Sequence, residues 1–324
     1  MTSLENKKVL VIGLGKSGLA AAELLHRLGA KVLAVDSADS PELQREVATL
    51  LARGIAVQLG SVAAPMTPFD FVVVSPGVPW SNPLLAEMNR RKLPILGEFE
   101  LGYQHSLCLN IAVTGTNGKT TTTELIERIL TANGLKAMTA GANGTPVSSI
   151  VEQTRELDFL VLEASSFQLE TIQYFRPGVA VLLNLSPDHL DRYGNMTDYA
   201  LAKARIFQNQ QPFDWAIVQS EALAQLRSLK VNIPSKIITF SANNRRADIH
   251  LDRGMLISRL DGWSGQFQPP SARCTVHIMS STSRATSLCL PVVCTSLKVR
   301  PVPTTMGQKP SSSVGPFFCQ RTLR

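Results

Sequence analysis

The sequence predicts an α/β fold with mainly parallel sheets, and two observations support this class. Short apolar segments alternate with helix-like segments from residue 9 to about residue 218, which is the order that parallel sheets covered by helices require. Two apolar segments run directly into glycine-rich loops, at residues 13–18 and 115–118, and each loop opens a helical pattern. We therefore expect two α/β units in series along the 324-residue chain, which is long enough for two ordinary cores.

The first unit is predicted from the strand at residues 9–12, which leads into the run GLGKSG at residues 13–18 and a helical pattern at 19–28. This spacing is typical of a Rossmann-like unit that binds the diphosphate of a nucleotide. The next predicted strand, 31–35, ends at Asp36, where a nicotinamide enzyme places a ribose-binding acid. The pattern leaves three interpretations open: NAD, another nucleoside diphosphate, or a tight turn without a ligand.

The second unit is predicted from the run TGTNGKTT at residues 114–121, between an apolar strand at 109–113 and a helical pattern at 121–130. Such a loop can bind polyphosphate oxygens through its backbone, with the lysine on the terminal phosphates and a threonine hydroxyl on Mg²⁺. The sequence thus predicts a P-loop ATPase-like central α/β domain that binds ATP and magnesium. The expected ATP-binding residues are Gly115, Thr116, Asn117, Gly118, Lys119, Thr120 and Thr121. A simple turn is the alternative, since Val113 replaces the first glycine of the common motif.

Polar residues follow two later strands. Glu163 ends an apolar strand and is expected to bind Mg²⁺ beside the phosphate loop, although a carboxylate before two serines can also begin a helix. The strand at residues 179–183 leads to the run DHLDRY at 188–193. Parallel sheets place their chemistry at the carboxyl ends of strands. His189 is therefore a candidate site residue, with an ordinary turn histidine as the alternative.

Charge is unevenly distributed along the chain. Seven of the 32 basic side chains and none of the 25 acidic ones lie within residues 271–324, so residues 1–270 carry 25 of each. The net charge of +7 therefore belongs to the C-terminal segment, and no basic module predicts nucleic-acid binding. No apolar stretch is long enough to cross a membrane, and the polar opening is not a secretory signal. We expect a cytoplasmic monomer that binds neither nucleic acid nor membranes.

Residues 271–324 also differ in composition. They hold four of the five cysteines, are crowded with Ser, Thr and Pro, and show no helix or strand periodicity. None of the cysteine spacings forms a C-x-x-C pair, so zinc binding is the weaker interpretation. We expect this basic segment to be disordered or non-native, as a frame-shifted reading of a gene would produce.

Three motifs together resemble the Mur ligase family of cell-wall peptide synthetases. They are TGTNGKT at residues 114–120, the shorter loop form of that family, EASSFQL at 163–169 and DHLDRY at 188–193. The last two look like the D-glutamate-adding member of the family. The resemblance covers roughly residues 5–265 and implies a UDP-substrate domain at 1–105 and a central ATP-binding domain, expected to be incomplete, at 106–270. It also implies that the family's third, C-terminal ligase domain is absent.

The resemblance assigns the first glycine loop to the UDP part of a substrate and not to NAD. The residues that match substrate-binding positions of the family are Lys16, Ser17, Asp36, Ser37, Ser75, Pro76, Gly77 and Asn143. The activity implied is ATP-dependent ligation of D-glutamate to UDP-N-acetylmuramoyl-L-alanine through an acyl phosphate, in peptidoglycan precursor synthesis. Because the third domain is expected to be absent, we expect impaired turnover.

The resemblance also implies the catalytic and metal-binding residues. Lys119 would act on the transferred phosphoryl group, Thr120 and Glu163 would hold one Mg²⁺, and His189 with a carbamylated Lys203 would hold a second. From the sequence pattern alone Lys203 would be an ordinary solvated lysine. Two other classes stay open: a non-catalytic protein that binds a UDP-sugar and ATP, and an NAD-dependent oxidoreductase.

Overall fold

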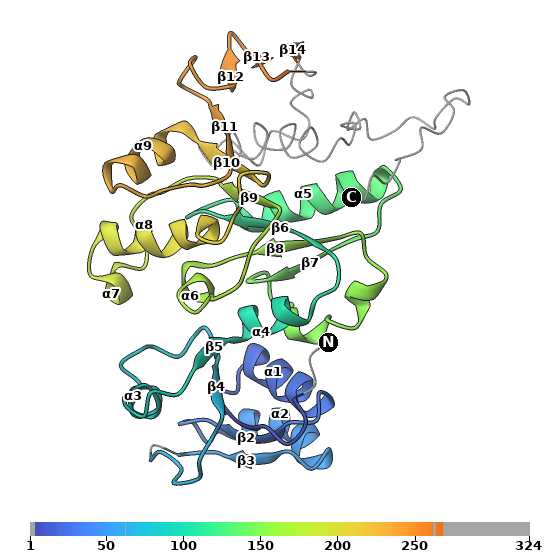
Figure 1. Cartoon of the computed structure of the whole chain (residues 1–324), viewed down its shortest axis with the longest axis vertical. Helices are drawn as coiled ribbons and strands as arrows, with labels where there is room; N and C mark the ends of the chain where they lie inside the picture. The colour runs from blue at the N-terminus through green and yellow to red at the C-terminus, as the bar shows by residue number, and fades with distance from the viewer. Residues whose placement is uncertain (1–3, 62, 262–263, 268–324) are drawn as a thin grey trace.

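The computed structural model describes residues 4–61, 63–261 and 264–267. The first five strands form a fully parallel sheet in the order β3-β2-β1-β4-β5 (Figure 1). They are β1 (Lys8–Ile12), β2 (Lys31–Val35), β3 (Ala56–Gln58), β4 (Phe71–Val74) and β5 (Ile95–Gly97). The helices that follow them are α1 (Lys16–Arg27), α2 (Pro41–Ala52), α3 (Pro83–Arg90) and α4 (Glu98–His105).

Both faces of this first sheet are covered. Val9 and Val11 of β1 pack with residues of α1 and α2, whereas Leu10 and Ile12 pack with residues of α3. Side chains alternate across a strand, so a strand covered on both faces must be apolar at every position. This requirement explains the continuous apolar run that the sequence shows at β1.

The second sheet has nine strands in the order β14-β13-β12-β11-β10-β9-β6-β8-β7. They are β6 (Leu109–Thr114), β7 (Ala137–Gly141), β8 (Phe159–Glu163), β9 (Val179–Leu182), β10 (Trp215–Gln219), β11 (Lys236–Ser241), β12 (Ile249–Asp252), β13 (Met255–Ser258) and β14 (Gly265–Phe267). Neighbours from β7 to β12 are parallel, and β13 and β14 add antiparallel pairs at one edge. The predicted α/β class with mainly parallel sheets is confirmed.

Helices cover both faces of the second sheet as well. They are α5 (Lys119–Ala132), α6 (Ser166–Leu169), α7 (Leu190–Tyr193), α8 (Met196–Ala204) and α9 (Ser220–Ser228), with 3-10 turns η1 (Val147–Ser149), η2 (Gln153–Arg155) and η3 (Arg205–Phe207). Ile111 and Val113 of β6 pack with residues of α5, whereas Ala112 packs in the cluster that contains residues of α8 and α9. Both helices after the glycine loops begin earlier than predicted, at Lys16 and Lys119 and not at 19 and 121, because the loop itself turns into the first helical turn.

Helix α4 lies between the two sheets (Figure 1). The Glu100 carboxylate accepts hydrogen bonds from the backbone N–H groups of Gln173, Tyr174 and Phe175, at 3.1, 2.9 and 3.1 Å. The Glu98 carboxylate accepts one from the Ser148 N–H at 2.7 Å, and burial raises its pKa to about 7. Two buried acids on one helix therefore fasten the end of the first unit to loops of the second.

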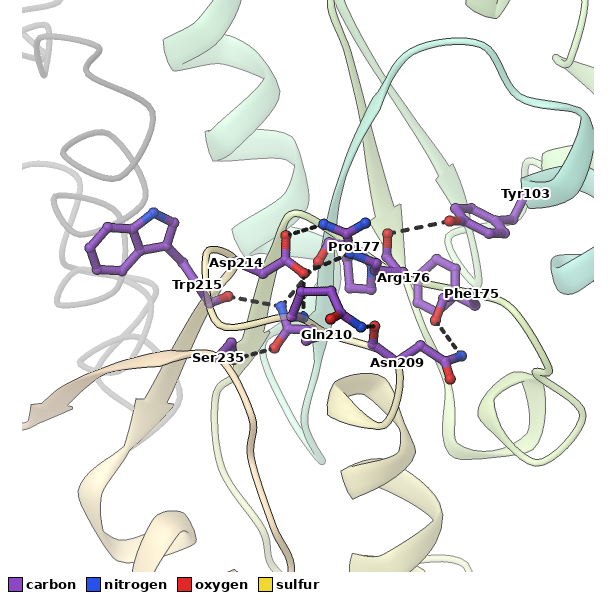
Figure 2. A network of polar contacts seen from close by, with 10 residues as sticks. Tyr103, Phe175, Arg176, Pro177, Asn209, Gln210, Asp214, Trp215 and Ser235 are labelled. Carbon is purple, nitrogen blue, oxygen red and sulfur yellow. Dashed lines mark hydrogen bonds and ion pairs between the residues drawn. The ribbon is translucent and has the colours of Figure 1, made fainter. Parts of the chain in front are cut away.

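A network of polar side chains closes the amino ends of the central strands (Figure 2). We call Arg176, Gln210, Asp214 and Ser235 the amino-edge network. Arg176 and Asp214 form two parallel hydrogen bonds of 2.8 and 2.9 Å. Gln210 donates to the carbonyl of Pro177, before β9, at 3.0 Å and to that of Trp215, the first residue of β10, at 3.1 Å. The Ser235 hydroxyl donates to Gln210 Oε1 at 2.7 Å. The side chains of the amino-edge network are thus paired with one another or with backbone.

The predictions for the C-terminal segment and for the domain boundaries are not tested by the described residues. The basic segment 271–324, with its four cysteines and the weaker zinc interpretation, lies outside the described residues. The domain boundaries near residues 105 and 270 stay predictions. Within the described part of the chain, no helix has the length and apolar character needed to cross a membrane.

Candidate nucleotide and substrate site

The backbone of the loop between β6 and α5 allows a ligand to approach it closely. Gly118 is the N-cap of α5 with φ 84°, and Gly115 has φ 154° with Leu183 Cβ only 3.0 Å from where its own Cβ would lie. Side chains are disfavoured at both positions. No side chain caps α5, so the N–H groups of its first turn remain available to an anion.

Asn184, which follows β9, holds this loop in place. Its Oδ1 accepts from the Asn117 N–H at 2.9 Å and its Nδ2 donates to the Asn117 carbonyl at 3.0 Å. The neighbouring Thr116 hydroxyl donates to the Ser186 carbonyl at 3.1 Å. Sequence analysis missed Asn184. Its position at the end of a parallel strand is the signal that could have found it.

Lys119 folds back over the loop. Its Nζ donates to the carbonyls of Gly115 and Thr116, at 3.1 and 3.0 Å. Burial lowers the pKa of this ammonium, while the charges of Glu163 and Asp188 act in the opposite direction. Lys119 is therefore a partly buried residue whose side-chain hydrogen bonds within the described part of the chain go to carbonyl oxygens of the phosphate loop.

Lys203, on the later helix α8, contacts the same loop. It is 2% exposed, and its Nζ donates to the Gly115 carbonyl at 2.9 Å and lies 4.7 Å from the centre of the Tyr199 ring. Burial, followed by the charge of Lys119, lowers its pKa to about 7. The interpretation as a solvated lysine is wrong. The Nζ atoms of two lysines share one carbonyl oxygen, which places two basic groups where an anion would bind.

Glu163 ends β8 beside this pair. Its side chain is buried, and Oε2 has no hydrogen-bond partner within the described residues. Glu163 does not begin a helix: α6 starts at Ser166, with Ser165 as its N-cap in a capping box with Gln168. A buried carboxylate oxygen without a donor fits a cation as ligand, and Thr120 is an exposed residue in the first turn of α5. These two residues therefore fit the role of Mg²⁺ ligands.

His189 lies at the N-cap of α7 with φ 52°, an uncommon left-handed conformation for a residue other than glycine. Its ring is 6.2 Å from the Tyr199 ring, which Lys203 also contacts, and 4.9 Å from the Phe167 ring. The structure thus places His189 and Lys203 next to the same tyrosine. Sequence analysis missed Tyr199, although it stands four residues before Lys203 on the same helix face.

Within the described ranges, no group of three or more His, Cys, Asp or Glu side chains could hold a metal ion. The predicted metal residues, Thr120, Glu163, His189 and Lys203, include only two of those types. A second metal would therefore need a different anionic oxygen, which a carbamate on Lys203 would supply.

The first glycine loop packs tightly against its own helix. A Cβ on Gly18 would lie 1.8 Å from the Gly13 carbonyl oxygen, and Gly13 has φ 87°. The Asp36 carboxylate accepts hydrogen bonds from the N–H groups of Leu14 and Ala38, at 2.6 and 2.8 Å. Asp36 therefore fixes the shape of this loop.

The other predicted substrate residues lie on loops after the parallel strands. Lys16 and Ser17 stand in the first turn of α1, Ser37 is exposed after β2, and Ser75, Pro76 and Gly77 follow β4. The Asn143 side chain accepts from the Thr145 N–H at 3.2 Å in the loop after β7. Each of these residues is thus at the carboxyl end of a strand or at a helix start, as a ligand site in parallel sheets requires.

Comparisons with known proteins identify the family to which this chain belongs. The chain folds as two α/β units, each with a glycine loop between a strand and a helix. The profile "Mur ligase MurD-like, N-terminal domain" matches residues 7–97, and "Mur ligase middle domain" matches residues 113–280. The second match covers more than half of the chain, so the protein belongs to the Mur ligase family.

Curated relatives carry a more specific name. A UDP-N-acetylmuramoylalanine–D-glutamate ligase of Koribacter versatilis is 43% identical over 239 residues, 74% of this chain and 52% of the relative. The ligase of the same name from Pelotomaculum thermopropionicum is 42% identical over 259 residues, 79% of this chain and 56% of the relative. The chain thus spans about half the length of the curated relatives it matches.

Solved structures support the fold. The UDP-N-acetylmuramate:L-alanyl-gamma-D-glutamyl-meso-diaminopimelate ligase of Neisseria meningitides gives a TM-score of 0.57 at 18% identity and covers 91% of this chain and 94% of that chain. At this identity the likeness concerns the fold alone.

Proposed function

We propose that the protein binds UDP-N-acetylmuramoyl-L-alanine at the first glycine loop and ATP at the second, and that it joins D-glutamate to the alanyl carboxylate in the cytoplasm. The observation that carries this proposal is the shared Gly115 carbonyl, where the Nζ atoms of Lys119 and Lys203 converge at 3.1 and 2.9 Å beside the Glu163 carboxylate. The proposed substrates are those in the names of the curated relatives.

In the proposed reaction, an oxygen of the alanyl carboxylate attacks the γ-phosphorus of ATP. The new O–P bond forms as the bond to the bridging oxygen breaks, giving an acyl phosphate and ADP. The amine of D-glutamate then attacks the acyl carbon, loses a proton and expels inorganic phosphate. Lys119 would neutralise charge on the transferred group, a contribution that dominates phosphoryl transfer.

Magnesium is the proposed cofactor. Thr120 and Glu163 would hold one ion, and His189 with carbamylated Lys203 would hold a second; when bound, the metal neutralises negative charge on phosphoryl oxygens. Carbamylation requires a neutral amine. A pKa of about 7 for Lys203 leaves a large fraction of this amine neutral at physiological pH, which supports the proposal.

A protein that binds both nucleotides without turnover is the second candidate, because the two matched family profiles describe only N-terminal and middle domains. The test is phosphate release from ATP and Mg²⁺ with UDP-N-acetylmuramoyl-L-alanine, with and without D-glutamate. Release that requires both substrates supports the ligase. Binding of the UDP-sugar without release supports the second candidate, and NADH binding with neither would contradict both.

A further inference from the structure

An ion pair of the second unit makes hydrogen bonds to the first unit beside the candidate site. Arg192 Nη2 donates to Glu170 Oε2 at 2.7 Å, and Trp80 Nε1 donates to the same oxygen at 3.0 Å. Arg192 Nη1 donates to the Pro76 carbonyl at 3.3 Å. Pro76 and Trp80 follow β4 of the first sheet, whereas Glu170 and Arg192 belong to the second unit. Two of these three hydrogen bonds, from Trp80 to Glu170 and from Arg192 to Pro76, therefore connect the two units.

The pair is shielded from solvent. The side chains of Arg192 and Glu170 are 16% and 13% exposed. Hydrogen bonds between ionised groups are stronger than neutral ones, and screening by water weakens them less when they are buried. This contact therefore differs from the surface ion pairs of the protein, such as that of Arg45 with Glu42, which is more than 70% exposed on both sides.

Arg192 also anchors the segment that carries His189. No residue of α7 is fully buried, and the ring of Tyr193, 6.0 Å from the Phe167 ring and 5.5 Å from the Tyr199 ring, gives this short helix its aromatic packing. The Arg192 guanidinium lies 4.1 Å from the centre of the Phe167 ring, and the His189 ring is 4.9 Å from the same ring. A left-handed residue such as His189 persists only where its surroundings determine it. The contacts of Arg192 and Phe167 provide those surroundings.

From these contacts we propose that Arg192 is a positioning residue that sets the substrate loop, residues 75–77, and His189 in one arrangement relative to each other. The identity of the ligand on that loop rests on the proposed function; the coupling itself does not. Arg192 contacts none of the expected reacting groups, so its effect passes through the loop and through His189. Arginine suits this role because its planar group donates in two fixed directions and stacks on a ring, which lysine cannot reproduce.

The first experiment needs no ligand. Amide hydrogen exchange is measured on the full chain as wild type, Arg192→Met and Arg176→Met. Arg176 is the matched control, because it makes a similar paired contact with Asp214 at the opposite edge of the central sheet. We expect peptides covering residues 75–80 and 188–193 to exchange about tenfold faster in Arg192→Met only. Unchanged exchange, or an equal rise in Arg176→Met, would overturn the proposal.

The second experiment uses UDP-N-acetylmuramoyl-L-alanine as the probe, in calorimetric titrations. We expect Arg192→Met to weaken its affinity about tenfold, with unchanged affinity for a non-hydrolysable ATP analogue, and Arg192→Lys to restore little of the loss. Equal affinity in wild type and Arg192→Met would overturn the positioning role. If the wild type does not bind this UDP-sugar but the exchange difference is present, the proposed substrate is wrong and the coupling stands.

Discussion

The amino edge and the carboxyl edge of the second sheet differ in how their polar side chains are paired. At the amino edge, the Asp214 carboxylate is matched by the Arg176 guanidinium and Gln210 is bonded to two carbonyls and a hydroxyl group. At the carboxyl edge, Glu163 Oε2 is buried without a donor within the described residues, and Lys119 and Lys203 crowd one carbonyl oxygen. Strands β9 to β11 thus begin in a paired network, whereas β6 and β8 end beside a buried carboxylate oxygen without a donor and two crowded lysine amines.

This difference separates stability from function. Buried polar groups are normally paired because an unpaired group loses its hydration without compensation. A protein keeps such groups where a ligand completes them. We therefore expect substitutions at the amino edge to lower the free energy of unfolding and substitutions at the carboxyl edge to lower nucleotide chemistry instead.

The largest effect is expected for Glu163→Gln. The amide keeps the shape of the side chain but removes the negative charge proposed to hold Mg²⁺, so ATP-dependent phosphate release should fall at least about a hundredfold. The free energy of unfolding should not fall, because the substitution removes a buried charge without a donor. Phosphate release and urea unfolding are measured on the same preparations.

Glu124→Gln is the matched control for that change. Glu124 is exposed on α5 and lies outside the loop, so this variant should release phosphate like the wild type. If Glu163→Gln lowered the free energy of unfolding and left phosphate release unchanged, the carboxyl edge would serve stability and not nucleotide chemistry.

At the amino edge we expect Asp214→Asn to lower the free energy of unfolding by about 2 kcal/mol. The carboxylate accepts from Arg176 and from the Gln211 N–H, and it is 5% exposed, so the substitution weakens a buried pair. Nucleotide affinity should stay unchanged. Chemical denaturation and a fluorescent ATP analogue test both parts, and weaker nucleotide binding without destabilisation would contradict the assignment of this edge to stability.

A smaller, pH-dependent effect is expected from Lys203. Its pKa is lowered from 10.5 to about 7 in the folded chain, so the unfolded chain binds more protons between these values. The contribution of Lys203 to stability is therefore most unfavourable below pH 7 and improves as the pH rises toward 10. The Lys203→Met variant should lose this rise.

The measurement is urea unfolding at pH 7 and pH 9, with the wild type and each variant compared at each pH so that shared titrations cancel. Lys236→Met is the control, because Lys236 is exposed at the start of β11. An equal slope with pH in the wild type and Lys203→Met would mean that Lys203 is not held in the surroundings described here.

The sequence predicted the elements whose signal is local. A glycine run between a strand and a helix identifies residues 114–121 without knowledge of the rest, and the strand before Glu163 is apolar throughout. Burial of Lys203 could not be predicted in this way. Its partner, the Gly115 carbonyl, is 88 residues away, and the helix around it shows only the pattern of a surface lysine.

The contacts of Arg192 could not be predicted either, because its partners are also distant in the sequence. Pro76 follows β4, Glu170 is the C-cap residue of α6 and Arg192 lies in α7, and no spacing within the sequence relates them. Loop conformation and the packing of two sheets decide which of these groups meet. Sequence patterns therefore predict the phosphate loop well, and they predict poorly the contacts between the two units that hold a substrate against it.

The smallest effect is expected from a substitution at the N-terminus of α6, which differs from the N-terminus of α5 at the same edge of the sheet. The Ser165 hydroxyl accepts from the Gln168 N–H at 3.2 Å and caps α6, whereas α5 has no side-chain cap. Ser165→Ala should lower the free energy of unfolding by about 1 kcal/mol and leave ATP affinity unchanged, because α6 satisfies its own N–H groups. Saturating ATP should stabilise this variant and the wild type by equal amounts in thermal unfolding. A smaller shift in Ser165→Ala would mean that the α6 cap, and not only the open start of α5, contributes to nucleotide binding.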